Sequence, residues 1–179
     1  LSGTYFPPKD MDAKNTAVLL VHDAGSDSAS VAALAEAWNK RGAAVLSLDL
    51  RGHGESKAER VDWTTASEKE REVLWAMAKR DLEAGESYLR ERTEVHSSRI
   101  VVAGKGAGAG LAVRYGIEGA GVAGVVLVDP PVEEEKTWGI DVAKGLAELE
   151  GLPALIVCCK ETRKACDAMA EAAHEANDG

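Results

Sequence analysis

One five-residue segment has the spacing of a turn that presents a catalytic nucleophile. The β-branched run at 99–103 predicts a short strand, and Gly104-Lys105-Gly106-Ala107-Gly108 follows it and leads into small residues that favour a helix start. Nucleophilic enzymes use Gly-x-Ser-x-Gly in such a turn, because the turn strains its central residue and tolerates only small neighbours. Here the central residue is Gly106. The turn is therefore predicted to be present without its nucleophile.

Apolar runs of strand length alternate with helical patterns along the whole chain. This alternation predicts an α/β fold with an open, mostly parallel sheet and helices on both faces. The expected strands are 4–6 (an edge strand that ends at two prolines), 17–21, 43–48, 99–103, 124–128 and 154–157. The expected helices are 31–41, one long helix over 67–91 that starts with a capping box, 107–115, 142–149 and 163–176.

Polar residues follow most of the expected strands. In an open parallel sheet, ligands bind beyond the carboxyl ends of the strands. This edge is predicted to collect His22, Asp23, the loop 49–56, residues 105–107, Asp129 and residues 158–162.

Size and composition restrict the broad class. The chain has 179 residues, of which 45% are hydrophobic and 28% charged, and this fits one soluble globular domain over 1–179. No apolar run approaches the ~20 residues that a membrane span needs. The formal net charge of −9 argues against a nucleic-acid partner. The first residue is Leu1, so we interpret the chain as processed or trimmed; export after removal of a signal peptide would fit, and the compartment is left open.

Three cysteines lie in one local segment. Cys158, Cys159 and Cys166 make an odd count without the spacing of a disulfide framework or a metal site, so we expect buried or half-buried thiols and no metal.

These motifs together resemble the α/β-hydrolase family, in particular esterases and dienelactone hydrolases. The resemblance covers nearly the whole chain, and the residues that carry it are Leu20-Val21-His22-Asp23-Ala24-Gly25, Asp49-Leu50-Arg51-Gly52-His53-Gly54-Glu55-Ser56, the turn at 104–108, Val128-Asp129-Pro130 and Leu152-Pro153-Ala154-Leu155-Ile156-Val157.

The resemblance implies a role for individual positions. In the family a Ser on the turn attacks an acyl carbonyl, a His takes its proton, an acid orients the His, and two backbone N–H groups hold the oxyanion. The nucleophile position is Gly106, the N–H donors would be Ala107 and either Asp23 or Ala24, and the acid would fall at Glu161 or Thr162. The family's His would follow one further strand, and the sequence ends at Gly179 before such a strand. The catalytic Ser and His are both missing from the pattern.

Other polar residues have simpler structural interpretations. We expect His22 and His53 to brace their loops, His174 to face solvent, and Ser26, Ser28 and Ser56 to cap helices or form turns. Asp49 and Asp129 are expected to serve loop architecture. The residues that we expect to contact a ligand are His22, Asp23, Ala24, Lys105, Gly106 and Ala107.

Three functions fit these observations. The first is a catalytically degenerate hydrolase scaffold that binds a small molecule or protein partner at the former active-site crevice, without a cofactor. The second is an active ester hydrolase that uses an unusual nucleophile or is completed by residues outside this sequence. The third takes Gly104-Lys105-Gly106-Ala107-Gly108-Ala109 as a dinucleotide fingerprint with Asp129 as the ribose acid, although two strand–helix units precede it. The sequence has no signal for the oligomeric state.

Overall fold

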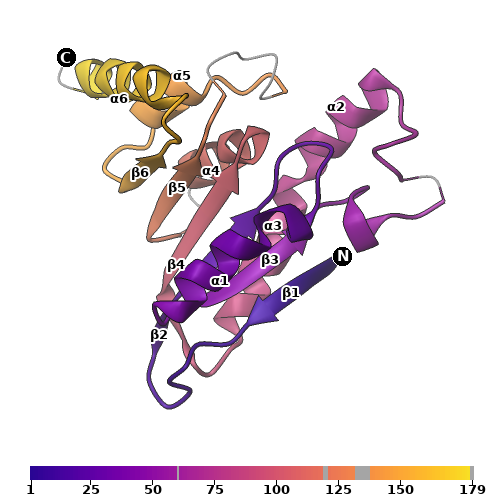
Figure 1. Cartoon of the computed structure of the whole chain (residues 1–179), viewed down its shortest axis with the longest axis vertical. Helices are drawn as coiled ribbons and strands as arrows, with labels where there is room; N and C mark the ends of the chain where they lie inside the picture. The colour runs from indigo at the N-terminus through magenta and orange to yellow at the C-terminus, as the bar shows by residue number, and fades with distance from the viewer. Residues whose placement is uncertain (60, 119–120, 132–137, 178–179) are drawn as a thin grey trace.

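A six-stranded, mostly parallel sheet forms the centre of the protein in the computed structural model, which describes residues 1–59, 61–118, 121–131 and 138–177 (Figure 1). The strand order is β1-β3-β2-β4-β5-β6, and β1 alone runs antiparallel to its neighbour, β3. The strands are β1 (Ser2–Phe6), β2 (Asn15–Val21), β3 (Ala44–Asp49), β4 (Val95–Lys105), β5 (Gly124–Val128) and β6 (Ala154–Val157). The predicted fold class is confirmed.

Helices pack on both faces of this sheet. They are α1 (Ala32–Lys40), α2 (Glu68–Met77), α3 (Lys79–Arg90), α4 (Ala107–Ile117), α5 (Val142–Ala147) and α6 (Arg163–Asn177), with 3-10 turns η1 (Ser28–Val31) and η2 (Gly54–Ser56). Each face of the sheet carries a hydrophobic core, and successive side chains of β2 point to opposite faces. Val18 and Leu20 pack on the α1 side, whereas Leu19 and Val21 pack in the core that contains residues of α3 and α4. Helices α5 and α6 pack together at the β6 end of the sheet (Figure 1).

The expected long helix over 67–91 is wrong, because it divides into α2 and α3 at Ala78. The predicted capping box is present: Ser67 Oγ accepts from the Glu70 N–H, and the Glu70 carboxylate accepts from the Ser67 N–H. At Ala78 the N–H bonds to the Trp75 carbonyl three residues back, so the last turn of α2 is tightened and the axis is interrupted. The interruption follows directly after Trp75, which is buried in the core.

None of the described helices combines the length and the apolar composition that crossing a membrane would require.

Strand β4 and helix α4 cross at very short range, and two glycines permit this. A Cβ on Gly104 would lie 1.9 Å from the Gly108 carbonyl oxygen, and a Cβ on Gly108 would lie 2.4 Å from the His22 carbonyl oxygen. Both obstacles are backbone atoms, which cannot turn aside as a flexible side chain would. The small residues on either side of Gly106 are therefore required by the packing of three backbone segments.

We predict that Gly104→Ala destabilises the protein by at least about 3 kcal/mol, which lowers the melting temperature by about 6–12 °C for a chain of this size. The matched control is Gly42→Ala, where φ is +98° but, in the part of the chain that the structure describes, nothing apart from the chain neighbours lies within 4 Å of the added Cβ, so only backbone strain of about 1–2 kcal/mol is expected. Thermal unfolding followed by circular dichroism measures both variants. Equal melting temperatures would contradict the packing argument.

Candidate functional site

The turn between β4 and α4 has the backbone geometry that a displayed nucleophile requires. Gly106 has φ +56° and ψ −129°, a conformation that residues with side chains rarely adopt. Its N–H donates to the Val128 carbonyl at 3.0 Å, which joins the turn to the end of β5. The strained turn predicted from the glycine spacing is therefore present, with glycine at its strained position.

The space that a side chain at position 106 would need contains the carboxylate of Asp23. A Cβ on Gly106 would lie 2.4 Å from the Asp23 Cγ and 2.5 Å from each carboxylate oxygen. Asp23 Oδ1 accepts from the Ala107 N–H at 2.7 Å and from the Ala24 N–H at 2.9 Å. Of the predicted ligand-contacting residues, the structure thus brings Asp23, Ala24, Gly106 and Ala107 together around one carboxylate.

Lys105 and Glu161 lie outside this cluster of contacts. Lys105 is half-buried at the end of β4, and its charge contributes to the lowered pKa of Asp129. Glu161 is exposed in the loop between β6 and α6. The resemblance to α/β-hydrolases implied that the acid that orients the catalytic His falls at Glu161 or Thr162. In the structure the Thr162 hydroxyl donates a hydrogen bond to Asp129 Oδ1 at 3.0 Å.

Asp129 connects the loops after β5 and β6. Its Oδ1 accepts from the Cys159 N–H at 2.6 Å, and this bond, with the Thr162 hydroxyl, lowers the pKa of the carboxyl group against the opposing effect of burial. Its backbone has φ +46°, and its N–H bonds to the Val157 carbonyl. The Asp129 carboxylate thus serves loop architecture, as expected.

The two histidines at this edge brace each other's loops. His22 Nε2 accepts from the Leu50 N–H at 3.1 Å, and His53 Nε2 accepts from the Gly25 N–H at 3.1 Å. In each ring Nδ1 faces a carbonyl oxygen, that of Asp23 for His22 and that of Arg51 for His53, so Nδ1 is assigned as the protonated nitrogen. Burial lowers the pKa of both rings, that of His53 to about 4. Both side chains are neutral at pH 7.

Aromatic rings pack against His53 and fill the space beside these loops. The His53 ring lies 4.5 Å from Trp63, which contacts Trp75 at 5.7 Å and Trp138 at 4.9 Å between ring centroids. Sequence patterns did not indicate that these tryptophans lie at this edge, because the residues are separated in the chain and do not share a periodic pattern.

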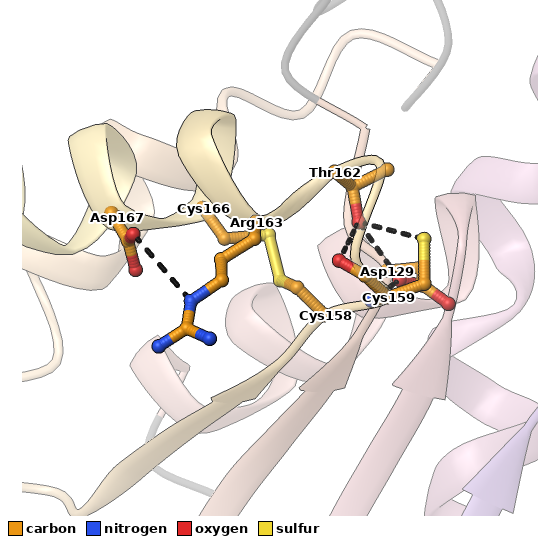
Figure 2. The surroundings of a disulfide bond; sticks show 7 residues. All are labelled: Asp129, Cys158, Cys159, Thr162, Arg163, Cys166 and Asp167. Atoms are coloured by element: carbon orange, nitrogen blue, oxygen red, sulfur yellow. Dashed lines mark hydrogen bonds and ion pairs between the residues drawn. A yellow bond between two sulfur atoms is a disulfide. The ribbon is translucent and has the colours of Figure 1, made fainter.

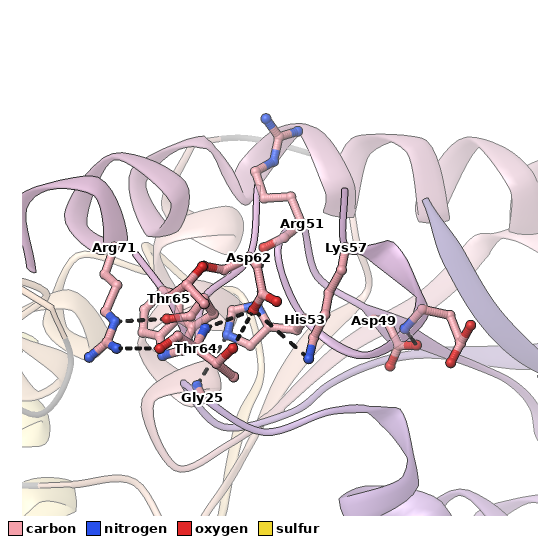
Figure 3. A network of polar contacts seen from close by, with 11 residues as sticks. Gly25, Asp49, Arg51, His53, Lys57, Asp62, Thr64, Thr65 and Arg71 are labelled. Atoms are coloured by element: carbon pink, nitrogen blue, oxygen red, sulfur yellow. Dashed lines mark hydrogen bonds and ion pairs between the residues drawn. The ribbon is translucent and has the colours of Figure 1, made fainter. Parts of the chain in front are cut away.

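Polar contacts hold the loop after β3, both within the loop and to neighbouring segments (Figure 3). The Asp49 carboxylate accepts from the Ser28 N–H at 2.7 Å and the Glu55 N–H at 2.9 Å. Burial opposes ionisation, but these bonds outweigh it and lower the pKa of Asp49. The Ser56 hydroxyl donates to the Asp49 carbonyl at 2.6 Å. The expected structural roles of Asp49 and Ser56 are confirmed.

The prediction of three thiols is wrong. Cys158, at the end of β6, and Cys166, on α6, form a disulfide, and Cys159 alone keeps an exposed free thiol (Figure 2). Sequence spacing could not indicate this pair, since the eight-residue separation becomes a Cα–Cα distance of 6.6 Å only when α6 turns back beside β6. Within the described ranges no group of His, Cys, Asp or Glu residues has the arrangement of a metal site.

Comparison with known proteins identifies the fold and a family. The family model described as serine aminopeptidase, S33, matches residues 12–155. No curated protein matches the sequence.

Solved structures resemble the chain at low sequence identity. A dienelactone hydrolase from Anabaena variabilis matches with TM-score 0.66 and 19% identity over 97% of this chain and 74% of that protein. An esterase from Pyrococcus furiosus matches with TM-score 0.64 and 20% identity over 99% and 78% of the two chains. The complex of DcsB with its substrate analogue matches with TM-score 0.59 and 17% identity over 73% of this chain, which spans only 41% of that protein.

The neutral state of His53 predicts a pH dependence of stability. Its pKa is about 4 in the folded protein and about 6.5 when unfolded, so between these values the unfolded chain binds a proton that the folded chain does not. The free energy of unfolding should therefore rise with pH across this interval, by about 3 kcal/mol from this group.

Urea denaturation at pH 4.5, 5.5, 6.5 and 7.5 measures this dependence. We expect His53→Gln, which cannot titrate, to give a shallower rise than the unsubstituted protein over the same interval. Parallel pH profiles for the two proteins would show that His53 is not the source of the pH dependence.

Proposed function

We propose that this chain, which belongs to the serine aminopeptidase S33 family of α/β-hydrolases, binds a small molecule or protein partner at the carboxyl edge of its sheet. We propose further that it does not hydrolyse what it binds. The single observation that supports this proposal is the Asp23 carboxylate beside Gly106.

The position of Asp23 opposes acyl transfer in two ways. A hydrolase of this family needs a side-chain nucleophile at the turn, and the volume that its Cβ would occupy contains the Asp23 carboxyl group. The hydrolase also needs unoccupied N–H groups to stabilise the oxyanion. The Ala107 and Ala24 N–H groups already donate to Asp23 Oδ1, so an incoming oxyanion would compete with a fixed negative charge.

The histidines near the turn are also unsuited to act as a base. A general base must offer an unshared nitrogen to the nucleophile. His22 and His53 each accept a backbone N–H at Nε2, and their Nδ1 atoms face carbonyl oxygens. Binding therefore fits these residues better than proton transfer does.

What the edge offers to a partner is one exposed carboxylate, that of Asp23. Asp23 is exposed although its carboxylate is fixed by two backbone bonds, and half-buried Lys105 follows on the same edge. A fixed charge loses little conformational freedom on binding. We therefore assign recognition to the surface formed by Asp23, Ala24 and Lys105.

The proposal makes a prediction about hydrolysis. The unsubstituted protein should neither cleave p-nitrophenyl acetate above the buffer rate nor react with a fluorophosphonate probe. Gly106→Ser and Asp23→Ala/Gly106→Ser should also remain inactive, because loss of a triad member costs ~10⁴ to 10⁶ in rate.

Mass spectrometry of the probe-treated protein locates any label. Specific labelling of a Ser or of Cys159 in the unsubstituted protein would favour the alternative of an active hydrolase with an unusual nucleophile. Robust hydrolysis by Gly106→Ser alone would show that the missing His does not matter.

The proposal also makes a prediction about the contact between position 106 and the Asp23 carboxylate. Gly106→Ser should destabilise the protein by about 3 kcal/mol, from backbone strain together with the collision with Asp23. Adding Asp23→Ala should recover about 1–2 kcal/mol of this loss, so the two substitutions are coupled. Gly139→Ser is the control, because its φ is +80° but no described residue beyond its chain neighbours has an atom within 4 Å of the added Cβ. Additive effects in urea denaturation would contradict the contact.

A further inference from the structure

Strand β6 is one edge of the sheet, and its outer side carries backbone groups without partners. The Pro153 and Val157 carbonyls accept hydrogen bonds from residues at the two ends of β5, so every second residue from 153 to 157 bonds toward β5. The N–H and C=O groups of Ala154 and Ile156 therefore point away from the sheet. No hydrogen bond to these groups is found in the part of the chain that the structure describes.

The opposite edge, β1, is protected in ways that β6 is not. Strand β1 is followed by Pro7-Pro8, and the Ser2 N–H at its start donates to Ser56 Oγ at 2.8 Å. Edge strands are commonly protected by short length, prolines, charges, bulges or covering segments. Strand β6 is short, but its residues Ala154–Val157 include no charge and no proline, and its pairing with β5 has no bulge. It therefore has few features that would prevent another strand from pairing with it.

The side chains of β6 on the α1 side of the sheet form an exposed apolar surface. Leu155 and Val157 are 58% and 43% exposed. Together with Val101 and Val126 of the neighbouring strands they line a hollow of about 250 Å³. Among the described residues of this lining, Arg41 alone is charged. An exposed apolar surface beside an open strand edge is typical of a protein interface.

The open edge is complementary to itself when two copies meet antiparallel about a twofold axis at Leu155. Ala154 of one copy then lies opposite Ile156 of the other, and the outward-facing N–H and C=O groups of both residues can exchange hydrogen bonds. The two Leu155 side chains meet across the axis at the close spacing of a pair that is not hydrogen-bonded. Both lie on the same face of the joined sheet, because the axis is perpendicular to it.

Charges on either side of β6 favour the antiparallel arrangement. Residues 148–153 include two acids and no cation, whereas residues 158–167 include three cations and two acids. Glu150 and Lys160 each lie five positions from Leu155, both are exposed, and neither forms an ion pair with a described residue. In an antiparallel pair the acidic flank of each copy lies beside the more basic flank of the other, twice by symmetry.

We infer that the outer edge of β6 pairs with β6 of a second copy of this chain, antiparallel and about a twofold axis, so that the two sheets join into one. The pairing gives partners to the outward backbone groups and covers Leu155 and Val157. A ladder of four residues provides few hydrogen bonds, so burial of these two side chains must contribute to the association. The inference goes beyond the function proposed for the Gly106 edge and does not rest on it.

Sedimentation velocity in 0.15 M NaCl, at protein concentrations from about 1 to 100 μM, tests the association. We expect the unsubstituted protein to shift from monomer to dimer over this range. Leu155→Lys should weaken the dimer at least about tenfold, because it places two ammonium groups across the axis. Val73→Lys is the matched control, since Val73 is 52% exposed on α2, and it should change the dissociation constant less than about twofold. A monomer at every concentration, or equal effects of the two substitutions, would overturn the inference.

Ala154→Pro tests the strand pairing itself. The Ala154 N–H faces outward, so proline removes a donor of the dimer and leaves the hydrogen bonds between β5 and β6 in place. We expect this variant to be monomeric, with a melting temperature close to that of the unsubstituted protein at the lowest concentration. Undiminished dimerisation of a folded Ala154→Pro variant would show that β6 does not form the interface.

Exchange of the flanking charges separates this arrangement from a general effect of net charge. Glu150→Lys and Lys160→Glu should each weaken the dimer, because each places like charges beside one another at both flanks, and the double substitution should restore it. Net charge alone would act differently: Glu150→Lys brings the charge of −9 closer to zero and would strengthen the dimer, whereas Lys160→Glu would weaken it. That pattern, or a double variant no better than the single ones, would overturn the inference. Circular dichroism checks that each variant is folded.

Discussion

The close packing of β4, α4 and the loop after β2 is the constraint on which the carboxyl edge depends. Gly104 and Gly108 allow three backbone segments to approach within distances that exclude a Cβ. This packing holds Gly106 at φ +56°, and it brings the loop that carries Asp23 against the turn. The position of the Asp23 carboxylate is a consequence of that approach. An acid fixed to the backbone N–H groups then satisfies donors that a hydrolase would leave for its substrate.

The loops around the turn are stabilised by buried neutral groups and a few oriented charges. His22 and His53 exchange hydrogen bonds between the loops after β2 and β3, and the tryptophans beside His53 exclude water from these bonds. In a low-dielectric surrounding an unpaired donor is costly, so these bonds favour one arrangement of the two loops. The arrangement gives a rigid edge, which is compatible with recognition and leaves neither ring nitrogen available for proton transfer.

The β6 end of the sheet is built differently. There α6 packs on α5, the disulfide links its second turn to the end of β6, and a groove with a mixed polar and apolar lining remains beside the strand. The two regions are connected through Asp129, which accepts hydrogen bonds from Cys159 and Thr162 in the loop that carries the disulfide. The Gly106 edge is therefore crowded, whereas an open groove of mixed polarity lies beside β6.

Local sequence patterns were enough to predict the strands, most helices and the carboxyl edge, because hydrophobic periodicity, caps and glycines act over a few residues. Residue 106 is a glycine and has no side-chain nucleophile, and the resemblance to α/β-hydrolases implied that Ala107 and either Asp23 or Ala24 lie beside it. Three features became visible only in the folded protein: the Asp23 carboxylate occupies the space that a side chain at position 106 would need, Cys158 pairs with Cys166, and α2 and α3 separate at Ala78. These features depend on distances between segments remote in sequence, or on how a buried Trp75 meets the core, and local patterns do not encode such distances.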